Sequence, residues 1–328
     1  MSAFRLAFSL LTGAALYGQT SSRTFHVTTV TNIEGLHEIG ALLRTVGDIQ
    51  QVSSDEARFD ITVRGTDAEL AVATWIVKQL DTTTPQPAEY GLADRGEAIN
   101  IVYAAHTPTQ AGMNEVATAL RAVAKVTQVF TYRSQHARQG IAFRTTIDQA
   151  PAAAWLVRQL DVAADDQNRW QPRRYLVPGN QDQVMKVDYL VHPAAQSDLN
   201  EMVTAIRQVA DLPAIFTRSE PQGIAFRGSA AKVQLAEWLF QQLDVAEPDT
   251  QMRLQQHEYS MAGVADGVTH VYYLNRAAPG DVVKAIRSEV QPRMFTSTKA
   301  KALAVRGTPD VMAVADRVVK QLDAPSNP

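Results

Sequence analysis

Histidines, carboxylates and glycine-rich loops are the features with which this chain could do acid–base, metal or phosphate chemistry. No two histidines stand in a His-x-His or His-Glu-x-x-His arrangement, which would bring two imidazoles onto one metal ion. They occur at positions 26, 37, 106, 136, 192, 257 and 270. The sequence contains no cysteine and no Gly-x-Ser-x-Gly, Walker or dinucleotide-binding glycine pattern. We therefore predict no metal site, no cofactor and no enzyme activity.

The overall charge argues against nucleic acid as a partner. The chain has 31 lysines and arginines against 34 aspartates and glutamates, so its formal net charge is -3. A chain with this balance lacks the general positive field that attracts proteins to phosphate backbones. We predict that it does not bind nucleic acid.

Arginines and aspartates recur in a fixed pattern. The tripeptide Gln-Leu-Asp occurs four times at intervals of 80, 83 and 79 residues, and it ends at Asp81, Asp161, Asp244 and Asp323. Each of its glutamines lies 15 residues after an arginine, and these arginines are Arg64, Arg144, Arg227 and Arg306. Two copies also share the hexapeptide Gln-Gly-Ile-Ala-Phe-Arg. Constant spacing in four copies indicates an internal repeat.

These repeated charges have a functional and a structural interpretation. Four spaced arginines could follow an anionic polymer, and four aspartates could form a catalytic column. Each arginine, however, lies where a strand turns into a helix, and its side chain can extend over the sheet edge or pair locally. Each aspartate ends a helix, where it can start a turn through its own backbone hydrogen bonds. We predict structural roles for all eight residues.

The fourth copy shows how one repeat is built. The predicted elements are a strand at 271–274, a helix at 281–289, strands at 293–297 and 302–306, and a helix that ends at Leu322. Thr308 is the expected N-cap of the last helix, with a proline and an aspartate in the first turn. In the first two copies, Thr66-x-x-Glu69 and Thr146-x-x-Gln149 fit capping boxes.

A tyrosine-containing segment before copies two, three and four predicts an added leading strand. The fold class is therefore α+β, with four tandem modules that each contain a three- or four-stranded sheet and two helices on one face. The predicted boundaries are a signal peptide at 1–19, modules at 24–81, 86–161, 172–244 and 257–323, and a tail at 324–328.

The N-terminal segment predicts export. Arg5 precedes an apolar run at 6–16, which has the length of a signal-peptide hydrophobic region. The alternative is a buried N-terminal helix, but no polar residues give the segment a second face. No later segment is long and apolar enough to span a membrane. We predict a periplasmic or secreted protein from which the signal peptide has been removed.

Three tryptophans occupy one repeat position, six residues before the aspartate, and are Trp75, Trp155 and Trp238. The fourth copy has Arg317 there. In the first copy Trp75 lies roughly 140° around the helix from the predicted inward stripe of Ala73, Ile76 and Leu80. Two interpretations remain open, namely packing against the other helix of the same module and contact with the following module.

The residues of the fourth copy resemble the N-terminal periplasmic ring domains of secretins, the outer-membrane channels of secretion systems and type IV pili. The resemblance rests on a Val-Tyr-Tyr-Leu strand, an Ala-Ile-Arg helix, a strand ending Val-Arg-Gly-Thr and a helix ending Val-Val-Lys-Gln-Leu-Asp. It implies a KH-like β-α-β-β-α fold and protein–protein contacts that stack or pair the domains. Because the chain ends five residues after the fourth Gln-Leu-Asp, we expect no channel domain.

Together these features predict an exported, non-enzymatic repeat protein. We expect it to bind or scaffold protein partners in the cell envelope, or to self-associate, within a secretion or pilus-like assembly. The alternative is a KH-like nucleic-acid-binding protein, but that mode requires a Gly-x-x-Gly loop with basic flanks, and no copy has one. An enzyme would require a buried pair of titratable groups, which the sequence does not reveal.

Overall fold

A computed structural model describes residues 20–133, 139–163, 165–166, 171, 173–179, 182–192, 194–255 and 257–324. The predicted signal peptide, residues 325–328 of the predicted tail and His136 lie outside the described residues. The chain divides into two compact units, Met1–Asp81 and Thr82–Pro328.

The first unit holds one three-stranded antiparallel sheet and two helices. Its elements are β1 (Ser21–His26), α1 (Ile33–Thr45), β2 (Gln51–Asp55), β3 (Asp60–Gly65) and α2 (Asp67–Leu80). The strand order is β1-β3-β2. We call this part module 1.

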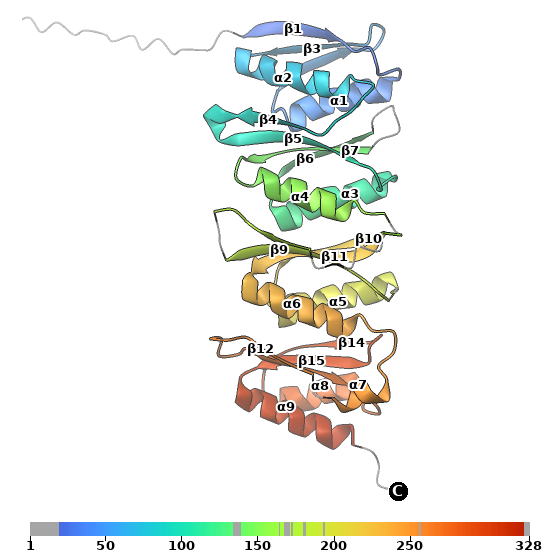
Figure 1. The fold of residues 1–328 in the computed structure, drawn as a ribbon, viewed down its shortest axis with the longest axis vertical. Helices are drawn as coiled ribbons and strands as arrows, with labels where there is room; N and C mark the ends of the chain where they lie inside the picture. The colour runs from blue at the N-terminus through green and yellow to red at the C-terminus, as the bar shows by residue number, and fades with distance from the viewer. Residues whose placement is uncertain are drawn as a thin grey trace, which may run out of the picture. The chain divides into compact units, whose positions relative to one another are not determined.

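The second unit holds three four-stranded antiparallel sheets (Figure 1). Module 2 consists of β4 (Ala88–Leu92), η1 (Ala93–Arg95), β5 (Glu97–Ala104), α3 (Gln110–Ala119), η2 (Leu120–Ala124), β6 (Gln128–Arg133), β7 (Gln139–Thr146) and α4 (Ala150–Leu160). Module 3 consists of β8 (Arg173–Leu176), β9 (Gln183–Tyr189), α5 (Gln196–Val209), β10 (Ala214–Ser219), β11 (Gln222–Ser229) and α6 (Ala230–Leu243). Module 4 consists of α7 (Thr250–Leu254), β12 (His257–Ser260), β13 (Val268–Tyr273), α8 (Pro279–Glu289), β14 (Arg293–Ser297), β15 (Ala302–Gly307) and α9 (Pro309–Leu322).

The predicted α+β fold class is confirmed. The leading strands β4, β8 and β12 each pair with the following strand at one edge of their sheet. Two local details differ from the sequence prediction. The helix expected to begin at residue 281 begins at Pro279, because a proline is tolerated in the first turn. The short helix α7 lies between the predicted boundaries of the third and fourth modules, where Asp249 caps it by accepting from the backbone N–H of Met252.

A side-chain cap begins the last helix in two of the four copies. Thr66 and Glu69 form the predicted capping box, and the Thr308 hydroxyl accepts from the backbone N–H of Val311. The second predicted box is wrong. Helix α4 begins at Ala150, and its N-cap Gln149 makes no capping hydrogen bond with its side chain.

Within the second unit, the helices of one module pack against the sheet of the next. On β9, Met185, Val187 and Tyr189 belong to the same apolar cluster as α3 and α4 of module 2. On β11, Ile224 and Phe226 pack with α5 and α6 of their own module. Because successive side chains on a strand point to opposite faces, the sheet of module 3 is covered on both sides.

The sheet of module 4 repeats this arrangement. Val271 and Tyr273 of β13 lie in the cluster that contains the helices of module 3. Leu303 and Val305 of β15 pack with α8 and α9. We call the contact between modules 2 and 3 junction 2–3, and the contact between modules 3 and 4 junction 3–4.

Candidate interaction site at the module junctions

The four repeated aspartates hold the end of the last helix of each module to the loop after strand β1, β5, β9 or β13. Asp161 accepts hydrogen bonds from the backbone N–H groups of Ala105 at 2.6 Å and His106 at 2.8 Å. Asp244 accepts from those of Val191 and His192. We expected a local turn, but the carboxylates bridge segments that are about fifty residues apart. The histidines at this position contribute their backbone N–H groups to the contact.

The same contact recurs in the first and last modules. Asp81 accepts from Thr28 and Thr29, and Asp323 accepts from the backbone N–H groups of Asn275, Arg276 and Ala277. Desolvation raises the pKa of Asp81, but the hydrogen bonds from Thr29 and Thr28 outweigh it, so the net shift is downward. Each aspartate therefore closes its own module.

The four strand arginines lie in four different environments. Arg144 is buried and pairs with Glu97. Arg306 is also buried, donates to the backbone carbonyl of Val209 in module 3 at 3.0 Å and pairs with Asp266. Arg64 is exposed, whereas Arg227 is partly buried. The four arginines share one backbone position in the repeat, but their hydrogen-bond and ion-pair partners differ from copy to copy.

Trp155 and Trp238 each lie beside a tyrosine of the following leading strand. The rings of Trp155 and Tyr175 on β8 have centroids 5.4 Å apart, and those of Trp238 and Tyr259 on β12 are 5.6 Å apart. Such separations are typical of stabilising aromatic pairs. Trp75 lies on α2 in the first unit. Arg317, at the same position in module 4, forms an ion pair with Glu289.

The tyrosines of β9 and β13 add a polar contact to each junction. The Tyr189 hydroxyl donates to the backbone carbonyl of Gln159, and the Tyr273 hydroxyl donates to that of Gln242, both at 2.6 Å. Burial raises the pKa of Tyr273 to about 12. Both acceptors belong to the Gln-Leu-Asp tripeptide. This tripeptide therefore ends one module and also accepts a hydrogen bond from the next module.

In modules 2 and 3, a glutamate of the first long helix (α3 or α5) contacts the following module. The sequence did not lead us to predict this contact. The Glu115 carboxylate accepts from the backbone N–H of Ser219 at 3.1 Å and from its hydroxyl. Glu201 accepts from the backbone N–H and hydroxyl of Thr298, each at 2.8 Å. The paired sequences Asn114-Glu115 and Asn200-Glu201 were a visible signal. Asp281 occupies the corresponding position in α8, six residues before the helix arginine.

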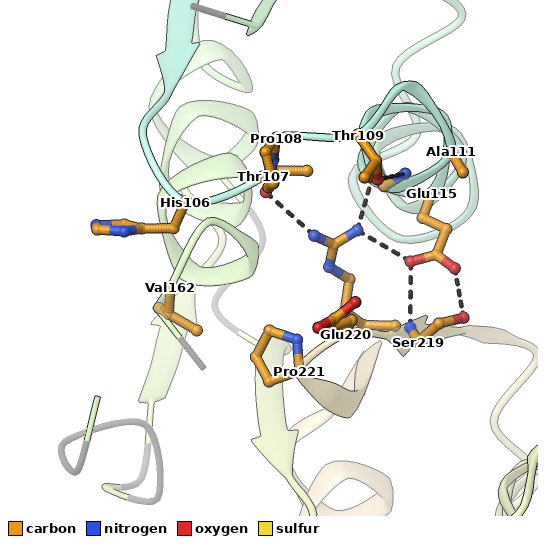
Figure 2. Close-up of a pocket in the computed structure, with 12 residues that line it drawn as sticks. His106, Thr107, Pro108, Thr109, Ala111, Glu115, Val162, Ser219, Glu220 and Pro221 are labelled. Atoms are coloured by element: carbon orange, nitrogen blue, oxygen red, sulfur yellow. Dashed lines mark hydrogen bonds and ion pairs between the residues drawn. The ribbon is translucent and has the colours of Figure 1, made fainter. Parts of the chain in front are cut away.

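Junction 2–3 also contains a buried arginine, Arg218, which contacts Thr107 and Glu115 of the preceding module; both of these residues are labelled in Figure 2. Arg218 of β10 is 3% exposed and donates to the Gly112 carbonyl at 2.7 Å, to Glu115 at 2.9 Å and to the Thr107 hydroxyl at 3.1 Å. Gly112 permits this approach, since a Cβ there would lie 3.1 Å from the guanidinium and 2.8 Å from Thr107. These groups line a cavity of about 280 Å³.

Buried titratable groups that the sequence did not reveal lie between sheet and helix in modules 3 and 4. The Lys186 ammonium, 1% exposed, pairs with Asp188 and Glu237 at 2.6 Å. Burial raises the pKa of Asp188 despite this pairing. In module 4, His270 lies between Asp316 and Glu258, at 3.1 and 3.2 Å. None of these side chains lines the cavities at junction 2–3.

Within the described part of the chain, no group of three or more histidine and acidic side chains is arranged to hold a metal ion. Among the same residues, no helix combines the length and apolar character needed to cross a bilayer.

The solved structures to which this chain is similar share little sequence with it. The N-terminal domain of the secretin XcpQ from Pseudomonas aeruginosa shares 13% identity over 44% of this chain and 63% of that chain, with a TM-score of 0.20. The type II secretion system secretin GspD of E. coli K12 shares 14% identity over 69% and 39%, with a TM-score of 0.16. An aspartate kinase from Synechocystis shares 13% over 95% and 56%, with a TM-score of 0.19.

The chain therefore spans less than two thirds of the length of the first of these structures, and less than half of the second. No protein-family model and no curated protein matches the sequence.

Proposed function

We propose that this chain is an exported, non-enzymatic scaffold that binds other proteins in the cell envelope, within a secretion or pilus-like assembly. The observation that carries the proposal is that buried arginine side chains join neighbouring modules at the junctions. Arg218 and Arg306, 3% and 4% exposed, both donate to a backbone carbonyl of the preceding module. An isolated buried charge is costly unless it is paired. In this chain, two such charges hold neighbouring modules together.

The ordering of the modules supports the scaffold role. Because the sheets of modules 3 and 4 are covered on both faces, any change in the position of one module would expose apolar surface. Repeated units that bury a common core present their outer surfaces at fixed spacing, which suits a protein that positions partners. The repeated motifs resemble those of secretin ring domains, and this resemblance also supports a role in protein–protein contacts.

We further propose that Trp155 and Trp238 stabilise contacts beyond their own modules. Each ring lies beside a tyrosine of the following leading strand. Trp75 holds the same repeat position in module 1. The charged Arg317 replaces the tryptophan in module 4, where it pairs within the module.

Export and partner binding can be tested together in the native cell. Fractionation with N-terminal sequencing should find the mature chain in the envelope or the medium, without residues 1–19. Cross-linking in the intact envelope, followed by mass spectrometry, should retain a defined protein set at reproducible stoichiometry. Intact N-terminal sequence confined to the cytosol would contradict export. Sub-micromolar, salt-sensitive binding of purified protein to single-stranded RNA or DNA would favour the KH-like alternative.

A further inference from the structure

The charges at junction 3–4 form a continuous chain of ion pairs. Arg306 pairs with Asp266 at 3.2 Å, Asp266 also lies 3.7 Å from Arg293, and Arg293 pairs with Asp211 at 2.9 Å. Lys232 completes the chain on Asp211 at 2.7 Å. Its hydrogen bond to Asp211, together with that from Arg293, lowers the pKa of this carboxyl to about 2. Every cation in this chain has a carboxylate neighbour.

The corresponding backbone positions at junction 2–3 carry different side chains. Arg306 lies opposite Arg293 across its sheet, and Arg227 lies opposite Ala214 in the same register. Asp211 and Lys125 both have a positive φ, 55° and 62°, and each lies three residues before the next strand. The acid of junction 3–4 is thus replaced by a lysine, and one arginine by an alanine.

Two cations consequently lack a partner at junction 2–3. Neither the Arg227 guanidinium nor the Lys125 ammonium forms a hydrogen bond or an ion pair with any of the described residues. In module 2, Arg144 pairs with Glu97, which lies opposite Thr146. The residue in that register position of module 3 is Gln183, opposite Ser229, so the amide cannot neutralise Arg227.

One carboxylate lies near this position in sequence. Asp182 has the register position of Asp266, because each lies three residues before the strand partner of the repeated arginine, Met185 for Arg227 and Thr269 for Arg306. Its side chain is exposed, however, and it makes no ion pair with the residues that the structure describes. The position that a carboxylate fills at junction 3–4 is therefore open at junction 2–3.

The unpaired cations line an open cavity of about 450 Å³. Lys125, Arg227 and Lys232 contribute three positive charges to its wall, against the single carboxylate of Asp211, which Lys232 and Arg293 already engage. Ser229 also lines the cavity, at the start of α6, and its side chain caps none of the N–H groups of that helix. Burial lowers the pKa of Arg227, which is the expected effect when a charged group is desolvated without a counter-ion.

We propose that this cavity binds carboxylate side chains of an acidic segment in a partner protein, with Arg227 and Lys125 as the anchoring cations. A carboxylate is the favoured ligand because Glu97, Asp266 and Asp211 fill the equivalent positions elsewhere in the chain. A guanidinium also matches a carboxylate through two parallel N–H donors. The proposal rests on the proposed scaffold function and names the chemistry of one partner.

Titration of the mature full-length chain with acetyl-(Glu)6-amide tests the site, with acetyl-(Gln)6-amide as the uncharged probe. Calorimetry at about 0.05 and 0.15 M salt should detect the glutamate peptide alone, more weakly at the higher salt. Arg227→Gln and Lys125→Ala should each weaken binding about tenfold or more, as expected for loss of a hydrogen bond between charged groups. Lys320→Gln removes an exposed cation from α9 and should leave the affinity unchanged.

Lys125→Asp gives an independent variant that the backbone tolerates, since Asp48 and Asp211 adopt the same positive φ. It should abolish peptide binding while the chain stays folded by circular dichroism. Equal affinity in the parent, Arg227→Gln and Lys125→Asp proteins would overturn the proposal, as would tighter binding of a single-stranded oligonucleotide at this site. The site and the scaffold function are tested separately. Loss of peptide binding in these variants tests the site, and the envelope cross-links of the parent chain test the scaffold function.

Asp182 is the internal competitor for Arg227, and Asp182→Asn distinguishes the two possibilities. If the cavity is open as we propose, this variant should bind the glutamate peptide as tightly as the parent or up to several-fold more tightly. If Asp182 occupies the site in solution, the parent should bind no peptide and only Asp182→Asn should bind it, which would overturn the assignment of the cavity to a partner.

Discussion

Junctions 2–3 and 3–4 share their apolar packing and two of their polar contacts. At both, a tryptophan lies beside a tyrosine, a tyrosine hydroxyl donates to the glutamine carbonyl, and a helix glutamate accepts from a hairpin hydroxyl. They differ in charge, since junction 3–4 pairs every cation of its chain, whereas junction 2–3 leaves Arg227 and Lys125 unpaired among the described residues. The repeat thus keeps the contacts that set module spacing and varies those that are open to a partner.

The buried bridging arginines also differ between the junctions. Arg218 reaches module 2 from β10, and the equivalent residue of β14 is Ser297. Arg306 reaches module 3 from β15, whereas the side chain of Arg227 at the same repeat position reaches no partner among the described residues. Each junction has one buried arginine, supplied by a different strand, so the function of this contact is shared although its sequence position is not.

The largest expected effect comes from removing such a bridge. Arg218→Ala should lower the free energy of unfolding of the second unit by about 3 kcal/mol, because it leaves the Glu115 carboxylate, the Gly112 carbonyl and the Thr107 hydroxyl without their charged donor. Urea unfolding followed by amide exchange in β9 and β11 measures the loss. Ser297→Ala, the matched change at junction 3–4, should cost less than about 1 kcal/mol. Equal losses would mean that the arginine does not bridge the modules.

Removal of the tryptophans should have an intermediate and similar effect at the two junctions. Trp155→Ala and Trp238→Ala should each cost about 1–3 kcal/mol, less than a full core deletion, because the rings are only partly buried. Amide exchange should then rise first in β8 for Trp155→Ala and in β12 for Trp238→Ala. Exchange that rises instead across the tryptophan's own sheet would show that the ring is part of its module's core.

Exchanging the charges at the matched turn positions should shift stability in opposite directions. Lys125→Asp places a carboxylate near Arg227 and should stabilise the chain by up to about 1 kcal/mol, whereas Asp211→Lys should destabilise it by a similar amount. Chemical denaturation of the two variants beside the parent measures both changes. If Lys125→Asp destabilises the protein, Arg227 already has a counter-ion in solution.

The smallest expected effect is a loss of stability in acid at junction 3–4. The folded-state pKa of Asp211 is about 2, below its ordinary value of 3.8, so its contribution is present above pH 3.8 and is lost as the pH falls toward 2. Since the Asp211 side chain is 46% exposed, solvent screening keeps this contribution below about 1 kcal/mol. The stability difference between the parent and Asp211→Asn should shrink over this window. A difference that is constant from pH 5 to 2 would contradict the assignment.

Local sequence signals predicted the fold well because they act over short distances. Strand-forming residues, Thr66 and Thr308 as N-caps, and the tyrosines of the leading strands each act within a few residues. The predicted aspartates do end their helices, but their hydrogen-bond partners lie in loops far away in sequence. Repeat spacing identifies an equivalent position and says nothing about which distant N–H group will lie beside it.

The junction chemistry could be predicted only in part for the same reason. Glu115 and Glu201 shared an Asn-Glu signal, and with the repeat register known they could have been found. Arg218 has no equivalent in the other copies, so no repeated pattern marked it. The contrast between Lys125 and Asp211 becomes informative only after the structure places each turn beside the next strand.

A double-mutant cycle between Glu115 and Arg218 tests most directly whether buried charge holds one module to the next. Glu115→Ala, Arg218→Ala and the double variant would be compared with the parent by native-state amide exchange of β11. We predict a coupling free energy of about 1–3 kcal/mol, since the two side chains are in direct contact across the junction. If the two single changes add within about 0.3 kcal/mol, the ion pair does not join modules 2 and 3, and the account of the junctions is wrong.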